Sequence, residues 1–171
     1  TTGSLYVAPT GSDTASGTQA QPLKTVAKAL KSIGAGGTVY LRGGSYTENI
    51  SVTPVKGTAT SRITLRAFAG ETPTIKGLFS LSSADYWTIS GITFRWNDAN
   101  GSDKHMVKLS GGTGWRIENC DIGGAKSFAG LLISGGAKNI YVGQNRIHDT
   151  FKSNATNQDH LIYANQVDGG I

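Results

Sequence analysis

Trp87-Thr88-Ile89-Ser90-Gly91-Ile92-Thr93-Phe94 is the stretch that decides the fold, because the same pattern returns twice further along the chain. Residues Trp115 to Ile122 and Ile140 to Ile147 each repeat it as a short alternating strand, a tight polar corner and a second short strand. The three copies begin 28 and 25 residues apart. A period of this length is typical of stacked repeats, in which no single unit buries its own apolar face.

A further apolar strand precedes each copy, so a complete repeat contains three short strands. These leading strands are Leu78–Leu81, Met106–Leu109, Leu131–Ile133 and, opening a fourth copy, Leu161–Tyr163. Three strands per repeat, parallel between repeats, predict an all-β right-handed parallel β-helix. Inward side chains would then form stacks: Ile89, Ile117 and Val142; Phe94, Ile122 and Ile147; Leu81, Leu109 and Ile133.

The corner inside each copy has its own requirements. Gly91 and Asn119 suit a left-handed backbone conformation there, whereas Gln144 suits it less well. Asn145, at an inward corner, would need its amide satisfied by backbone groups. Cys120, the only cysteine of the chain, occupies a repeat position that predicts burial in the core.

We predict one β-helix domain over residues 1–171, with an N-terminal capping region (1–37) followed by coils (38–171). One helix is expected at 22–33, because Pro22 suits a first helical position and the apolar residues after it recur at helical spacing. The fourth copy stops at Ile171 without a closing helix or polar cap, so we expect further coils downstream. The start at Thr1, without Met or a signal peptide, is typical of a mature secreted chain.

Composition limits the partners. The 171 residues include 24 glycines and only 16% charged residues, which is typical of a turn-rich β protein. A net charge of +5 and a pI near 9.4 favour an anionic partner. The basic residues are scattered singly, which argues against nucleic acid, and no stretch reaches the length of a membrane span. We therefore expect a chain that binds neither nucleic acid nor membrane, and one that is a monomer if it is full length.

Several segments carry a family resemblance: Gly11–Gly17, Pro22–Val26, Ala35–Tyr46, Gly70–Ile75 and Tyr86–Gly91. Through them, nearly the whole chain resembles the pectate-lyase-like superfamily of secreted bacterial β-helix proteins. The resemblance implies that the helix caps the first coil. It also implies a secreted polysaccharide lyase, or a piece of one, that cleaves an acidic, uronate-containing polysaccharide by β-elimination. The superfamily also includes glycosidases, epimerases and phage tailspikes.

In relatives of this kind the substrate runs along the sheet of leading strands, between long loops. The two-residue period of a strand places Val107 and Leu109 inward and Met106 and Lys108 outward. The outward columns predicted in this way are Ser80, Lys108, Leu132 and Ile162, and Met106, Gly130 and His160.

A lyase of this class must neutralise a carboxylate, remove the neighbouring proton and help the leaving oxygen depart. Titratable side chains are densest between residues 146 and 163, where Asp159 and His160 are adjacent. We predict four catalytic residues: His160, Lys152, Arg146 and Tyr163.

Other residues are candidates for binding. Lys108 and Lys126 could attract a polyanion, and Trp96 could stack on a sugar. Asp149 and Asp159 could supply oxygen ligands for Ca²⁺, an ion that the resemblance makes an expected cofactor. The alternative interpretation is that the lysines are solvated and the aspartates cap turns.

Two other functions stay open. A glycoside hydrolase on the same scaffold would need paired carboxylates on the open sheet face, and no such pair is evident in the sequence. A non-catalytic carbohydrate-binding or structural β-helix would need no catalytic residues. The products formed from acidic polysaccharides would distinguish these functions from a lyase.

Overall fold

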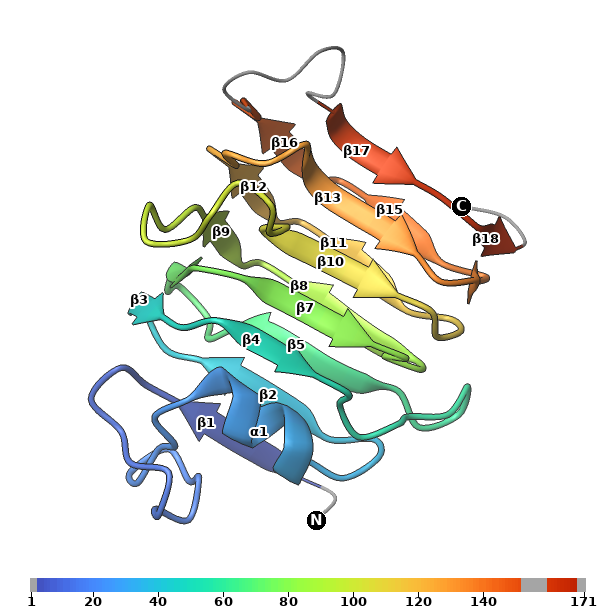
Figure 1. Ribbon diagram of the computed structural model, residues 1–171. Coiled ribbons are helices and arrows are strands. Elements are labelled where there is room, and N and C mark those ends of the chain that lie inside the picture. Colours follow the sequence, from blue (N-terminus) through green and yellow to red (C-terminus); the bar gives the residue numbers. More distant parts are fainter. Residues whose placement is uncertain (1–2, 152–159, 169–171) are drawn as a thin grey trace.

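The computed structural model describes residues 3–151 and 160–168. Its strands form a parallel β-helix, in which the chain passes through three sheets and each coil lies on the one before (Figure 1). Neighbouring strands of each sheet pair in parallel. The predicted fold class is confirmed.

Each sheet is built from one strand per coil. The first sheet contains β1 (Ser4–Val7), β2 (Thr38–Leu41), β5 (Ile63–Ala67), β8 (Trp87–Ser90), β11 (Arg116–Glu118) and β15 (Tyr141–Gly143). The second contains β3 (Gly44–Thr47), β6 (Pro73–Lys76), β9 (Thr93–Arg95), β12 (Asp121–Gly123) and β16 (Arg146–His148). The third contains β4 (Ile50–Val52), β7 (Phe79–Ser82), β10 (Val107–Ser110), β13 (Ala129–Ser134) and β17 (His160–Ala164). A separate pair joins β14 (Ala137–Lys138) to β18 (Val167–Asp168).

The core consists of the predicted inward stacks. In the first sheet Ile117 pairs with both Ile89 and Val142. The equivalent stacks of the second and third sheets are centred on Ile122 and Leu109. Because every second residue of a strand faces inward, the coils bury one continuous apolar interior, which also contains Trp87, Trp115 and Cys120.

The corners have the predicted backbone. Gly91, Asn119 and Gln144 all have positive φ angles, of 73°, 53° and 55°. Next to the last of these corners, the side chain of Asn145 accepts a hydrogen bond from the Cys120 N–H and donates one to the Ile117 carbonyl, both at 2.9 Å. The asparagine amide thus joins two coils, as predicted.

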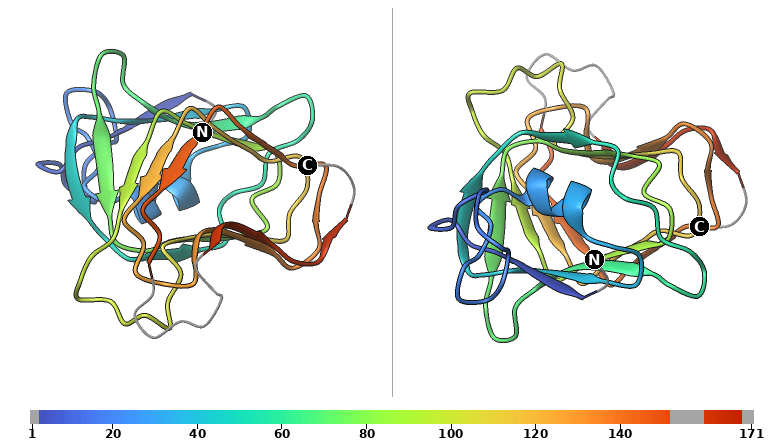
Figure 2. Two further views of the ribbon diagram at one scale, coloured as in Figure 1. Left: turned by 90° about the horizontal axis from the view of Figure 1, so that it is seen from above. Right: turned by 90° about the horizontal axis from the view of Figure 1, so that it is seen from below.

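Helix α1 (Val26–Ser32) covers the N-terminal end of the stack, where Figure 2 shows it within the outline of the coils. The predicted capping role is confirmed, but the predicted start at Pro22 is wrong. Thr25 caps the helix by accepting from the Lys28 N–H, and the carboxylate of Glu48 accepts from the two N–H groups at positions 26 and 27. Leu23 instead forms a parallel bridge with Val7, so the residues before Thr25 are not helical.

Three predictions on the third sheet are wrong. Tyr163, not Ile162, aligns with Leu132, and His160 aligns with Ala129 rather than with its neighbour at position 130. The run Leu-Ile-Tyr at 161–163 has no apolar–polar alternation, so the sequence pattern does not fix its register. Met106 is fully buried rather than outward, because β10 begins only at the next residue and strand alternation does not extend to it.

Within the described part of the chain, no helix has both the length and the apolar character needed to cross a membrane.

Candidate functional site

A groove of about 350 Å³ lies on the outer face of the third sheet. Its floor is formed by outward side chains of β4, β7 and β10, and one side is formed by residues 103–105 of the loop between β9 and β10. The polar residues that line it are Asn49, Ser51, Ser80, Asp103, Lys104, His105 and Lys108. Leaving His105 aside, the described lining residues include two lysines and one aspartate, which together carry one net positive charge.

Lys108 lies at the centre of an outward row that crosses the sheet. The register aligns it with Ser80 on one side and Leu132 on the other, and Tyr163 continues the row. Among the residues that the structure describes, no carboxylate lies within ion-pair distance of the Lys108 ammonium group. Its charge is therefore available to an anionic ligand in the groove.

A line of rings extends from the groove along the stack of coils. His105 meets the Phe128 ring edge-on with centroids 4.4 Å apart, and Phe128 meets Tyr163 at 5.8 Å. The His160 ring lies 5.2 Å from the Tyr163 ring. The His160 ring thus contacts outward-facing Tyr163, although the register aligns His160 with fully buried Ala129 and alternation from Ile162 would direct it inward.

A second polar cluster lies on the second sheet. The His148 ring contacts Asp149 through Nδ1, at 2.6 Å, and Asp121 through Nε2, at 2.9 Å. Asp121 also forms ion pairs with Arg95 at 2.6 Å and Arg146 at 3.6 Å. The hydrogen bonds to Asp149 and Asp121 raise the pKa of His148. Burial raises the pKa of Asp121, but its bonds to His148 and Arg95 outweigh burial and lower it.

The structure separates the four predicted catalytic residues. His160 and Tyr163 are in contact on the third sheet, whereas Arg146 is on the second sheet and pairs with Asp121. Lys152 lies outside the described residues. Catalysis by these residues stays a prediction.

The predicted binding residues also differ in their positions. Lys108 lines the groove, and exposed Lys126 forms a 2.6 Å ion pair with Asp98. Trp96 has only 7% of its surface exposed and belongs to the core. Burial leaves its ring little surface for stacking on a sugar, because Trp96 stands two positions after inward Phe94 and faces the same interior.

Among the described residues, the two predicted metal ligands are not seen together in a metal site. The Asp149 carboxylate is exposed and bonded to His148, and Asp159 lies outside the part of the chain that the structure describes. Within residues 3–151 and 160–168, no group of three or more acidic, histidine or cysteine side chains is placed to hold a metal ion. Calcium binding stays a prediction.

Sequence reasoning did not identify Asn49 or His105 as site residues. His105 lies between Lys104 and Lys108 at the end of a long connection, and this local density of basic side chains was a usable signal. Asn49 gave no comparable signal, because asparagine before a short strand is common in turns.

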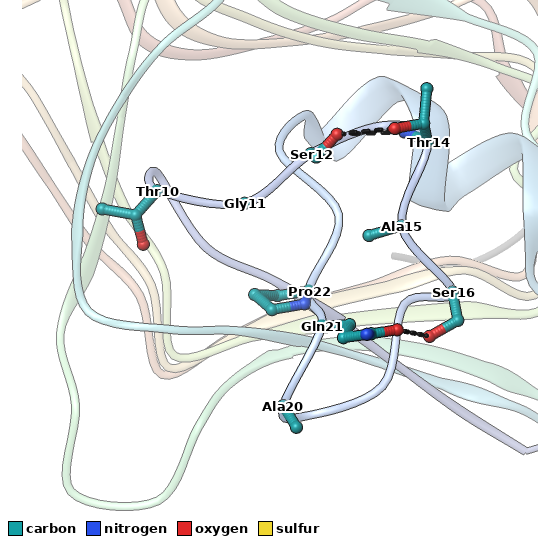
Figure 3. Close-up of a pocket in the computed structure, with 9 residues that line it drawn as sticks. All are labelled: Thr10, Gly11, Ser12, Thr14, Ala15, Ser16, Ala20, Gln21 and Pro22. Carbon is teal, nitrogen blue, oxygen red and sulfur yellow. Dashed lines mark hydrogen bonds between the residues drawn. The ribbon is translucent and has the colours of Figure 1, made fainter.

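A second hollow, of about 640 Å³, lies within the loop formed by residues 10–22 (Figure 3). Small and uncharged side chains line it, and the hydrogen bonds drawn there join Ser12 to Thr14 and Ser16 to Gln21. Because no ionisable side chain of the described residues lines this hollow, the groove on the third sheet is the better candidate of the two for acid–base chemistry.

Comparison with known proteins places the fold in a family. Residues 5–169 match the family model described as the Pel9A-like, right-handed beta helix region, which agrees with the predicted hand. Over 75 residues the chain is 47% identical to pectate lyase PEL9 of Emericella nidulans, a match that covers 43% of this chain and 18% of that protein. Over 145 residues it is 34% identical to the uncharacterized protein YwoF of Bacillus subtilis, covering 84% of this chain and 28% of that protein.

A solved structure of a rhamnogalacturonan lyase aligns with 97% of this chain and 51% of its own, at 13% identity and a TM-score of 0.43. The chain spans between 18% and 28% of the length of the curated relatives given above.

Proposed function

The chain belongs to the family of Pel9A-like right-handed β-helix proteins, and from this premise we propose that it acts in a secreted polysaccharide lyase that cleaves an acidic, uronate-containing polysaccharide. The observation that supports this most directly is the groove on the third sheet. It is open, carries a net positive charge and is lined on β10 by Lys108, which forms no ion pair among the described residues. The name of the relative from Emericella nidulans, a pectate lyase, supports the same class of reaction.

The proposed reaction is a β-elimination. A base removes the proton on the carbon beside the uronate carboxyl group, the bond to the glycosidic oxygen breaks, and a carbon–carbon double bond forms. The departing oxygen takes up a proton to become a hydroxyl group. Neutralisation of the carboxylate favours loss of the first proton, because negative charge builds up beside it in the transition state.

Of these requirements, the described residues best suit neutralisation of the substrate carboxylate. Lys108 and Lys104 would pair with carboxylates of the substrate in the groove. The polymer would extend along the stack of coils, past Phe128, toward Tyr163 and His160. In this arrangement His160 is the proposed base, and the adjacent Tyr163 is the proposed proton donor.

Calcium stays a separate part of the proposal. When bound, the ion would neutralise a substrate carboxylate. Asp149 is engaged by His148 rather than directed to an oxygen-rich cage, so the described residues do not fit a calcium site and no step is assigned to the ion. Assays with and without calcium test this part directly.

The decisive experiment uses pectate, alginate, hyaluronan and chondroitin, each with and without calcium. We expect one of them to give the ultraviolet absorbance of an unsaturated uronate. Lys108→Ala should lower the affinity for that polymer, whereas Lys76→Ala, which changes an exposed lysine on the second sheet, should not. Absence of this product with every polymer would overturn the lyase proposal.

The same assay separates the alternatives. Release of reducing sugar without new absorbance would indicate hydrolysis, for which the groove offers only one carboxylate, that of Asp103, among its lining residues. Binding without any product would indicate a carbohydrate-binding β-helix.

A further inference from the structure

We propose that an amide pair between Asn49 and Asn100 fixes the loop of residues 97–105 as the wall of the groove, and that Asn100 is thereby a positioning residue for an acidic saccharide. The inference rests on the proposed function for its ligand. It assigns a role to a residue that does not itself line the groove.

Both ends of this loop are held in the core. Trp96, immediately before it, is 7% exposed, and Met106, immediately after it, is fully buried. The Met106 carbonyl also accepts a 2.7 Å hydrogen bond from the Phe79 N–H. Only nine residues lie between two fixed points, so the loop has a short path, which projects from the stack between β9 and β10 (Figure 1).

The middle of the loop is joined to another coil through two side-chain amides. Asn49 Nδ2 donates to Asn100 Oδ1 at 3.0 Å, and Asn100 Nδ2 donates back to Asn49 Oδ1 at 3.2 Å. Asn49 is itself fixed, because its Oδ1 also accepts from the Leu78 N–H at 3.1 Å. Gly77 leaves room for this segment, since a β-carbon there would clash with the Glu48 carbonyl oxygen and meet Asn49 Oδ1 at 2.9 Å.

A second tether of the same loop is the ion pair between Asp98 and Lys126, at 2.6 Å. Its two side chains are 76% and 60% exposed, and an exposed ion pair is weak and screened by salt. The amide pair carries no net charge, so salt does not screen it, and its two hydrogen bonds join exposed Asn49 to half-buried Asn100. We therefore infer that Asn100, rather than Asp98, is the residue that holds the loop in position.

The position of the loop matters to the groove because residues 103–105 form one of its sides. Lys104 faces the groove beside Asp103, to which its ammonium group is paired at 3.2 Å, and His105 rests against Phe128. Lys108 lies on the floor, on β10. A carboxylate in the groove meets two lysines only while the wall stays in place. The amide pair thus favours acidic over neutral saccharides.

The experiment compares Asn100→Ala with Asp98→Asn, which cuts the other tether of the same loop. The probes are trigalacturonate and its methyl ester, which has the same length without the charges. We expect Asn100→Ala to weaken trigalacturonate binding about tenfold, equivalent to about 1.4 kcal/mol. Binding of the ester should change less than about twofold, and the salt dependence of trigalacturonate binding should become shallower. Asp98→Asn should leave all three quantities near the wild-type values.

Hydrogen exchange provides a readout that needs no ligand. The Lys104 N–H donates to the Gly101 carbonyl within the loop, at 3.1 Å. Its exchange should accelerate about tenfold in Asn100→Ala and stay unchanged in Asp98→Asn. Unchanged exchange in Asn100→Ala would show that the amide pair does not hold the loop.

The remaining outcomes separate this inference from the proposed function. Faster exchange with unchanged trigalacturonate affinity would overturn the role of Asn100 in binding while leaving the lyase proposal intact. Equal losses for trigalacturonate and its ester would also overturn it, because they indicate a general loss of shape. If the wild-type protein does not bind trigalacturonate, the ligand assigned to the groove is wrong. Hydrogen exchange at Lys104 then still decides whether the amide pair fixes the loop.

Discussion

The interior coils and the last coil share one pattern of inward residues but bury it to different extents. In β11, β12 and β13, the inward residues Ile117, Ile122 and Leu131 are fully buried. Their aligned partners in β15, β16 and β17 are Val142, Ile147 and Ile162. The first two of these are half-buried, and Ile162 is 46% exposed. Similar apolar side chains are therefore more deeply buried, and contribute more to stability, where coils pack on both sides of them.

Polar contacts hold the last coil where apolar burial is incomplete. Asn145 bonds to two backbone groups of the preceding coil, and His148 bonds to Asp121 of that coil. In a solenoid each unit contacts only its neighbours, so its stability is approximately a sum of such interfaces. The comparison indicates that the stability of the interior coils depends on apolar packing, whereas that of the last coil depends more on a few hydrogen bonds.

The largest expected effect comes from the matched pair Leu131→Ala and Ile162→Ala. Leu131 is fully buried, and truncation should reduce the free energy of unfolding by about 2–5 kcal/mol, through lost transfer energy and the cavity left behind. Ile162 is half exposed, so its truncation should cost about 1 kcal/mol, because less apolar surface is removed from burial. Urea unfolding of both variants measures the difference.

Equal losses from the two substitutions would break the comparison. That result would mean that Ile162 is as well packed in solution as Leu131, so that the last coil is not distinct from the interior. A larger change for Ile162→Ala in the slope of unfolding free energy against urea concentration would indicate instead that the last coil unfolds separately.

A smaller effect is expected from Asn145→Ala. The substitution leaves the Cys120 N–H and the Ile117 carbonyl without their side-chain partner, which should cost about 1–3 kcal/mol. Asn165→Ala is the control, because Asn165 is exposed in the same coil and, among the described residues, its backbone N–H but not its side chain is hydrogen-bonded. Thermal unfolding compares the two, and similar losses would show that the coil-to-coil bonds of Asn145 add nothing.

The sequence predicted the interior coils far better than the site. Ile89, Ile117 and Val142 align as expected, because a two-residue period with one buried face fixes register. The run at 161–163 lacks that period, and the predicted register was one residue off. Met106 was also misplaced, since alternation holds inside a strand and this residue lies just outside one. Trp96 was assigned to the loop edge, although it stands two positions after inward Phe94 and shares its burial. The Asn49–Asn100 contact joins residues 51 positions apart in the sequence, and no local pattern encodes such a contact.

The smallest expected effect is a pH dependence of the tie between the last two coils. Protonated His148 can donate to Asp149 through Nδ1 and to Asp121 through Nε2 at once, and these bonds raise its pKa. Of the described charged groups, Arg146 opposes protonation, whereas Arg95 acts through its pair with Asp121. Because the folded-state pKa lies above the unfolded value of about 6.5, the stabilisation is complete below that value. It is lost as the pH rises through the folded-state pKa.

The comparison of wild type with His148→Gln isolates this effect, because glutamine keeps a polar side chain but does not titrate. The wild-type melting temperature should exceed that of the variant at about pH 5.5, and the difference should shrink as the pH rises to about 8.5. The change should be modest, because Asp149 is exposed and solvent screens its pair with His148. A difference that stays constant or grows with pH would show that proton binding by His148 does not fasten β16 to β12.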